Sequence, residues 1–87
     1  MSKIVVNKFT AGWCQPCKVL ASVLEKIKSD FPNIEIQEVS IDTPDGAQIA
    51  ASHGIRGVPV LLANGKMFSN TAITERSVRT WLEGLSS

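Results

Sequence analysis

The two cysteines of this 87-residue chain, Cys14 and Cys17, are separated by only two residues. A purely structural disulfide between them would contribute little, since a four-residue ring returns about 2 kcal/mol where a fifteen-residue ring returns about 3 kcal/mol. A zinc site usually needs two such pairs, or one pair and two histidines. This chain has one pair and a single histidine, His53, so we expect no metal unless two chains share it. The spacing therefore favours redox chemistry, in which a dithiol and a disulfide interconvert.

Hydrophobic patterning places this pair where a strand hands over to a helix. Residues 3–9 form a short segment rich in β-branched side chains, which is typical of a buried strand. Over residues 15–31, apolar residues recur at the spacing of a helix. Cys14 therefore falls at or next to the helix N-cap, where unpaired N–H groups and the helix dipole favour a thiolate. Lowering a thiol pKa from about 8.5 to about 7 raises the thiolate fraction at pH 7 from about 3% to half.

The neighbours of Cys14 would tune this chemistry. Cys17 lies one helical turn further in and should be the more shielded thiol, placed to attack a mixed disulfide formed at Cys14. Pro16 suits the first helical turn, where its missing N–H is harmless. We expect Gln15 and Pro16 to set the stiffness of the turn, and Lys18 to be solvated and to add slightly to the positive potential.

The rest of the chain predicts the elements that would hold this site. We expect a strand over residues 34–41, a helix capped at Thr43 with help from Asp42, a strand over 58–62, a hairpin at residues 64–65 leading into a strand over 66–69, and a last helix over 74–85. Strands separated by helices should pair in parallel. The order β-α-β-α-β-β-α thus predicts an α/β fold, a four-stranded mixed sheet with helices on both faces, in one domain over residues 1–87.

Composition excludes several function classes. Nine basic and eight acidic residues give a net charge of +1, whereas nucleic-acid binders show a strongly basic stripe. The longest apolar run, residues 58–63, is far shorter than the roughly 20 residues of a membrane span. Residues 1–6 contain too few apolar side chains for a signal peptide. We therefore expect a cytoplasmic protein that binds neither nucleic acid nor membrane.

Two motifs carry a family resemblance. The sequence WCQPCK at residues 13–18 resembles the active-site motif of thioredoxins, and GIRGVP at residues 54–59 resembles the loop that holds the cis-proline of that family. The resemblance implies a minimal thioredoxin fold and a dithiol–disulfide oxidoreductase that binds no cofactor. Its redox centre would be the reversible Cys14–Cys17 disulfide, with Cys14 as nucleophile and Cys17 as resolving thiol.

The resemblance also implies a substrate groove. A target would bind in an extended conformation to a shallow apolar groove formed by Trp13, Gly57, Val58 and Pro59, with a cis bond before Pro59. The family usually has a glycine in the groove wall where this chain has Thr71 or its neighbour Ala72. The larger side chain would narrow the groove.

The chain departs from the family in other ways. It is closer in size to glutaredoxins, since it is too short for the additional N-terminal strand and helix of ordinary thioredoxins, and Gln15 replaces the usual glycine between the cysteines. Where the family has a buried aspartate, this chain has Lys8, and where the family has the partner lysine, it has Glu38. The two charges are thus exchanged. Strand periodicity allows both side chains to point toward a covered face of the sheet. A buried pair of this kind could relay a proton to or from Cys17; alternatively, each side chain reaches solvent.

Three functions compete. The first is a monomeric protein disulfide reductase, recharged by a flavin-dependent thioredoxin reductase with NADPH, whose disulfide-bearing targets include ribonucleotide reductase. The second is a glutaredoxin-like protein recharged by glutathione, although glutaredoxins usually have Pro-Tyr between the cysteines and no preceding tryptophan. The third is a non-catalytic binding module that uses the fold only to dock partners.

Overall fold

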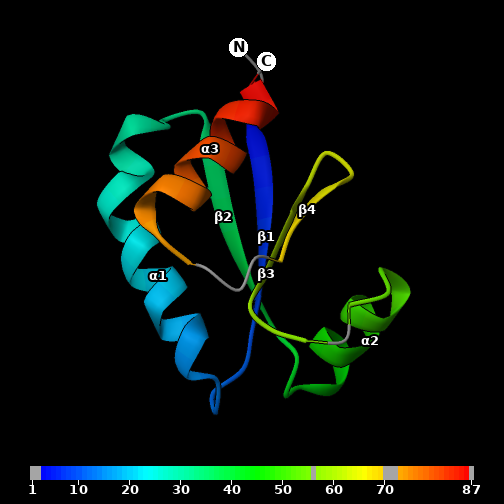
Figure 1. The fold of residues 1–87 in the computed structure, drawn as a ribbon. Helices are drawn as coiled ribbons and strands as arrows, with labels where there is room; N and C mark the ends of the chain where they lie inside the picture. Colours follow the sequence, from blue (N-terminus) through cyan, green and yellow to red (C-terminus); the bar gives the residue numbers. More distant parts are fainter. Residues whose placement is uncertain (1–2, 56, 70–72, 87) are drawn as a thin grey trace.

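A computed structural model describes residues 3–55, 57–69 and 73–86 of the chain. The elements follow one another as β1 (Ile4–Thr10), α1 (Gln15–Ile27), a short 3₁₀ helix η1 (Lys28–Asp30), β2 (Ile34–Ser40), α2 (Pro44–Ser52), β3 (Val60–Ala63), β4 (Lys66–Phe68) and α3 (Glu75–Ser86) (Figure 1). The predicted order of strands and helices is confirmed.

The four strands form one mixed sheet in the order β2-β1-β3-β4. β1 and β2 are parallel, as predicted, but β3 runs antiparallel to β1, with Phe9 opposite Val60 and Asn7 opposite Leu62. The expectation that β3 would also be parallel is therefore wrong. The chain leaves the end of β2, passes through α2 and returns to the same end of the sheet, so β3 starts beside the end of β1.

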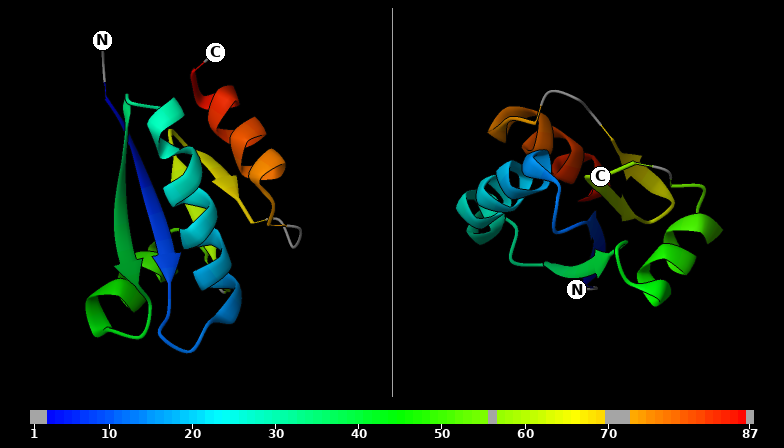
Figure 2. Two further views of the ribbon diagram at one scale, coloured as in Figure 1. Left: turned by 90° about the vertical axis from the view of Figure 1, so that its left-hand side faces the viewer. Right: turned by 90° about the horizontal axis from the view of Figure 1, so that it is seen from below.

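The helices cover both faces of the sheet (Figure 2). α1 and α3 pack on one face around the larger core, which includes Val6, Leu20, Leu61, Val78 and Leu82. α2 lies on the other face, where a smaller core forms from Phe9, Ala50, Ile55 and Val60. Alternation along β1 sends Val6 to one core and Phe9 to the other. This arrangement agrees with the predicted fold class.

The first helix is shorter than its apolar pattern predicts. α1 ends at Ile27, and the tighter 3₁₀ turn of η1 follows, with the Phe31 N–H donating to the Lys28 carbonyl at 3.0 Å. The buried residues of α1 are Cys17, Leu20, Leu24 and Ile27. Val19 belongs to the predicted apolar face but is 49% exposed, because the helix carries a wider apolar stripe than the core covers.

α2 begins with a side-chain cap. Thr43 Oγ1 accepts the Gly46 N–H at 3.1 Å, while the Thr43 hydroxyl donates to the Ser40 carbonyl at 2.8 Å. Gly46 lies against the end of β2 so closely that an added Cβ would stand 1.7 Å from the Ser40 oxygen. Only glycine fits this contact, which fixes how α2 leaves the sheet.

β3 starts at Val60, two residues later than predicted, because a bend over residues 57–59 precedes the strand. The Val58-Pro59 bond within this bend is cis. The hairpin between β3 and β4 is confirmed at residues 64–65. Asn64 and Gly65 both have positive φ, 52° and 75°, as a two-residue turn of this kind requires.

Candidate active site

Cys14 occupies the N-cap of α1, as the sequence predicts. Its backbone is extended (φ −94°, ψ 110°), and its sulfur accepts a hydrogen bond from the Cys17 N–H at 3.2 Å. The Cys14 N–H itself donates to the Ala11 carbonyl at 3.2 Å, which closes the turn between β1 and the helix. An amide donor at a helix N-terminus stabilises negative charge, so this position favours a Cys14 thiolate whenever the disulfide is open.

Cys14 and Cys17 form a disulfide, with their Cα atoms 5.3 Å apart. Each cysteine is 4% exposed, and the pair packs with Ala11 and against the partly buried Ile41 and Val58. The expected difference in shielding is therefore absent in this oxidised form, since the bond holds both sulfurs in one apolar cluster. A thiol or disulfide that reacts here must approach along the surface beside this cluster.

Asp42 fixes the loop before Cys14, a role that the sequence analysis missed. Its carboxylate accepts the Gly12 N–H at 3.1 Å and a hydrogen bond from the Ser40 hydroxyl. Together, first the Ser40 bond and then the Gly12 bond lower the pKa of Asp42 below its ordinary value of 3.8. Thr43, not Asp42, caps α2. Gly12 and Asp42 are 30 residues apart, so no local pattern could have paired them.

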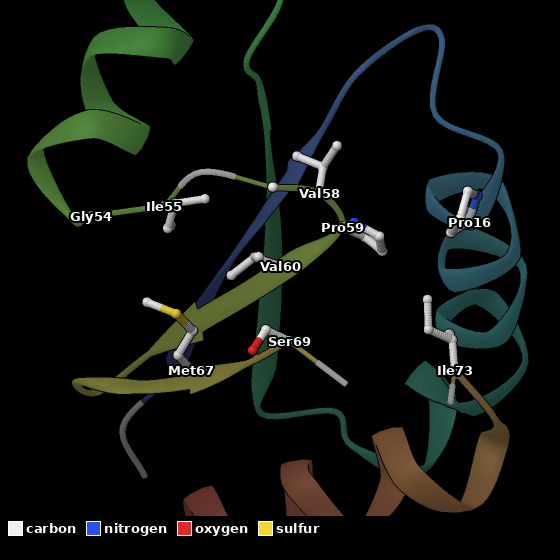
Figure 3. A pocket seen from close by; sticks show the side chains of 10 residues that line it. Pro16, Gly54, Ile55, Val58, Pro59, Val60, Met67, Ser69 and Ile73 are labelled. Carbon is white, nitrogen blue, oxygen red and sulfur yellow. The ribbon is translucent and has the colours of Figure 1, made fainter. Parts of the chain in front are cut away.

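An apolar groove has a volume of about 460 Å³ (Figure 3). It meets the cysteine cluster at Val58, which lines the groove and packs against this cluster. Gly57, Val58 and Pro59 line the groove, as the resemblance implied, together with Pro16, Gly54, Ile55, Val60, Met67, Ser69 and Ile73. No charged side chain is among these described residues. In Figure 3, Pro16 and Ile73 lie on one side of the groove, and Val60 and Met67 lie on the other.

One predicted groove residue differs from expectation, and another lies outside the described part of the chain. Trp13 does not line the groove; it sits in the turn before α1 with 72% of its surface exposed, since neither core reaches that turn. Thr71 and its neighbour Ala72 lie outside the described residues. Ile73, which was not predicted, is a large apolar side chain among the lining residues. It precedes α3 outside any periodic pattern, so patterning gave no signal for it.

The exchanged charges form an ion pair. Lys8 Nζ lies 3.5 Å from Glu38 Oε2, on paired positions of β1 and β2. The Lys8 side chain is 14% exposed, but that of Glu38 is 63% exposed. Each of the two open alternatives therefore holds for one partner. The Glu38 side chain reaches solvent from the edge strand β2, whereas the Lys8 side chain is mostly covered on the inner strand β1. Both line a hollow together with Ala21 and Leu24 of α1.

The remaining residues between and after the cysteines lie on the surface. Gln15, Pro16 and Lys18 are exposed on the first turn of α1. Within the described ranges, no group of histidine, cysteine, aspartate or glutamate side chains is arranged to hold a metal ion. No helix in the same part of the chain is long and apolar enough to span a bilayer.

Comparison with known sequences identifies the relatives of the chain. It is 42% identical over 62 residues to protein disulfide-isomerase erp38 of Neurospora crassa, covering 68% of this chain and 17% of that protein. It is 38% identical over 58 residues to a thioredoxin of Pyropia yezoensis, covering 67% of this chain and 53% of the relative. A thioredoxin of Chlamydia trachomatis is 34% identical over 77 residues, 88% of this chain and 70% of its own length. The chain thus spans about half the Pyropia relative and a small part of the Neurospora protein.

Solved structures agree with the sequence relatives. Oxidised thioredoxin O2 of Arabidopsis thaliana shares the fold with a TM-score of 0.77 at 21% identity, covering 99% of this chain and 77% of its own. The Malassezia sympodialis thioredoxin matches with a TM-score of 0.74 at 28% identity over the same shares of the two chains. The sequence profile of the family described as Thioredoxin matches residues 1–83. On this match, which covers most of the chain, the protein belongs to the thioredoxin family.

Proposed function

We propose that this protein is a thioredoxin-type protein disulfide reductase. The observation that carries the proposal is the Cys14–Cys17 disulfide at the N-terminus of α1, with the Cys17 N–H directed at the Cys14 sulfur. A groove whose described lining residues are uncharged and mostly apolar shares Val58 with the cysteine cluster, and it supports a target segment as substrate. The electrons are carried by the two sulfurs themselves, with no bound cofactor.

The reaction begins from the reduced pair. The Cys14 thiolate attacks one sulfur of a target disulfide; the bond between Cys14 and the target forms, the target disulfide breaks, and the first target thiolate takes up a proton. Cys17 then loses its proton and attacks the Cys14 sulfur. The Cys14–Cys17 bond forms, the bond to the target breaks, and the second target thiolate takes up a proton. Two electrons pass from the pair to the target.

Surrounding residues would assist these steps. The Cys17 N–H stabilises the Cys14 thiolate before attack, and Gln15 and Pro16 hold the two sulfurs in one helical turn. Val58 and Pro59 bind the target backbone next to the cysteines, and the exposed indole of Trp13 contacts the target surface. Lys18 adds positive charge near the site.

Lys8 and Glu38 together would relay the proton lost by Cys17: the Lys8 ammonium passes one of its protons to the Glu38 carboxylate, and the Lys8 amine then takes up the proton of Cys17. The mostly covered side chain of Lys8 and its ion pair with Glu38, which reaches solvent, support a route for a proton from beneath α1 to water. We expect K8M or E38Q to shift the pH dependence of target reduction. If both variants keep the pH profile of the unsubstituted protein, the proton relay is wrong.

Two electrons and a proton must then return to the pair. A flavin-dependent thioredoxin reductase would take them from NADPH, which gives up a hydride, and pass them to the disulfide by thiol–disulfide exchange.

Disulfide-bearing proteins, ribonucleotide reductase among them, would receive the electrons. The cytoplasmic location, the monomeric state and the single domain over residues 1–87 stay predictions.

The test is insulin reduction with two alternative electron donors. We expect turnover with NADPH and thioredoxin reductase, and little with glutathione. C17S should stop turnover and accumulate a mixed disulfide at Cys14; activity that survives in C17S with glutathione would establish the glutaredoxin-like alternative. Unchanged partner binding by the C14S/C17S double variant, combined with no insulin reduction by the unsubstituted protein, would establish the binding module instead.

A further inference from the structure

A second hollow adjoins the groove. It has a volume of about 330 Å³ and is lined by Gln15, Pro16, Val19 and Ile73. Pro16 and Ile73 line both this hollow and the groove. These two side chains therefore form a ridge between the two depressions, which we call the Pro16–Ile73 ridge. Gln15 and Pro16 lie between the two cysteines in the sequence, so the second hollow lies at the first turn of α1, which also holds the redox-active pair.

The residues of the second hollow do not serve the fold alone. Val19 is 49% exposed although it belongs to the apolar stripe of α1, and its neighbour on the stripe, Leu20, is fully buried in the core. Ile73 packs against the larger core but is only partly buried. Leaving apolar side chains in water is unfavourable by about 25 cal/mol for each Å² that a partner could cover.

We infer that the second hollow is a second subsite for the target, and that Ile73 is a specificity-determining residue. This inference rests on the proposed function. The occupant is an extended segment of the disulfide-bearing target, which places one apolar side chain in the groove and another in the second hollow, on the two sides of the Pro16–Ile73 ridge. The chemistry supports this occupant, because the described lining residues of both hollows are uncharged and predominantly apolar. The two hollows also adjoin, since they share Pro16 and Ile73.

The test measures selectivity between two synthetic peptides. Each has a central cysteine bound as a disulfide to a thionitrobenzoate group, whose release is coloured; one peptide has leucines on both sides of the cysteine and the other has serines. We expect the reduced protein to react with the leucine peptide at least about tenfold faster in kcat/KM, as apolar contacts in a pocket typically discriminate. I73A and V19A should each lower that ratio severalfold.

I49A is the matched control, because Ile49 is 44% exposed on α2 and lines neither hollow. It should keep the selectivity ratio. V19A keeps the test decisive if I73A disturbs the core. Equal rates for the two peptides, or a preference that both I73A and V19A leave intact, would overturn the second subsite while the proposed function stands. Failure of the unsubstituted protein to reduce either peptide would overturn the proposed function itself.

Discussion

Substituting Gly46 by alanine should destabilise the protein strongly, because the new methyl group has no room. Its Cβ would stand 1.7 Å from the Ser40 oxygen, 2.6 Å from the Ser40 carbonyl carbon and 2.9 Å from Thr43 Oγ1. The first two atoms belong to the backbone of the β2 end and cannot rotate away. The N-terminus of α2 must therefore move, which disrupts the Thr43 cap.

The size of the effect follows from these contacts. Overpacking a tight site costs about 1–3 kcal/mol, and losing a threonine cap costs about 1 kcal/mol. We expect G46A to lower the free energy of unfolding by about 3 kcal/mol in total. For a domain of this size, each kcal/mol changes the melting temperature by about 4–8 °C, so G46A should melt about 12–24 °C lower.

The assay is thermal unfolding of the oxidised protein, followed by circular dichroism. G84A is the matched control, since Gly84 lies within α3 and an added Cβ there meets nothing within 4 Å. Alanine at a helical position of this kind stabilises by up to about 1 kcal/mol, so G84A should melt slightly higher. If G46A melts within a few degrees of G84A, the close approach of Gly46 to the end of β2 is refuted.

Three further predictions concern the loop before Cys14, the Cys14 thiol and the larger core. The hydrogen bonds to Asp42 depress its pKa below 3.8. They therefore stabilise the fold above that pH, and this stabilisation is lost as the pH falls through the pKa of the folded state. In urea titrations between pH 6 and pH 3, D42N should lose less stability than the unsubstituted protein. In the reduced protein, Cys14 should ionise below the value of about 8.5 for a free cysteine, as measured by thiolate absorbance, and an unshifted titration would remove the basis of the mechanism. L20A should destabilise by about 2–5 kcal/mol, because Leu20 is fully buried, and a loss below 1 kcal/mol would mean that the core relaxes around the cavity.

The sequence predicts the local features of the site well. Cys14 at the N-cap of α1 follows from the change from strand patterning to helix patterning at that point of the chain. The cis bond before Pro59 follows from the resemblance of residues 54–59 to the family's loop. The direction of β3 was mispredicted, because an apolar pattern identifies a strand without giving its orientation. The exposure of Glu38 stayed open for a related reason: alternation assigns a face of the strand, but only the strand order shows that β2 lies at an uncovered edge.

Long-range contacts lie beyond what patterning can reach. The Gly12–Asp42 hydrogen bond joins two loops that meet only because β1 and β2 are parallel and end together. Ile73 was missed because its position against Pro16 depends on how α3 docks beside α1. Such contacts are set by the packing of whole elements and have no signature in a short segment.

The beginning of β1 and the end of α3 lie at the same end of the molecule (Figure 1). β1 starts at Ile4 and leads toward the cysteines, while Lys66, at the far turn of the sheet, donates a hydrogen bond to the Gly84 carbonyl near the end of α3. The first and last described segments therefore lie together at the pole opposite the disulfide (Figure 1). A tether, a label or a solid support attached there would leave the reactive pole facing outward and accessible.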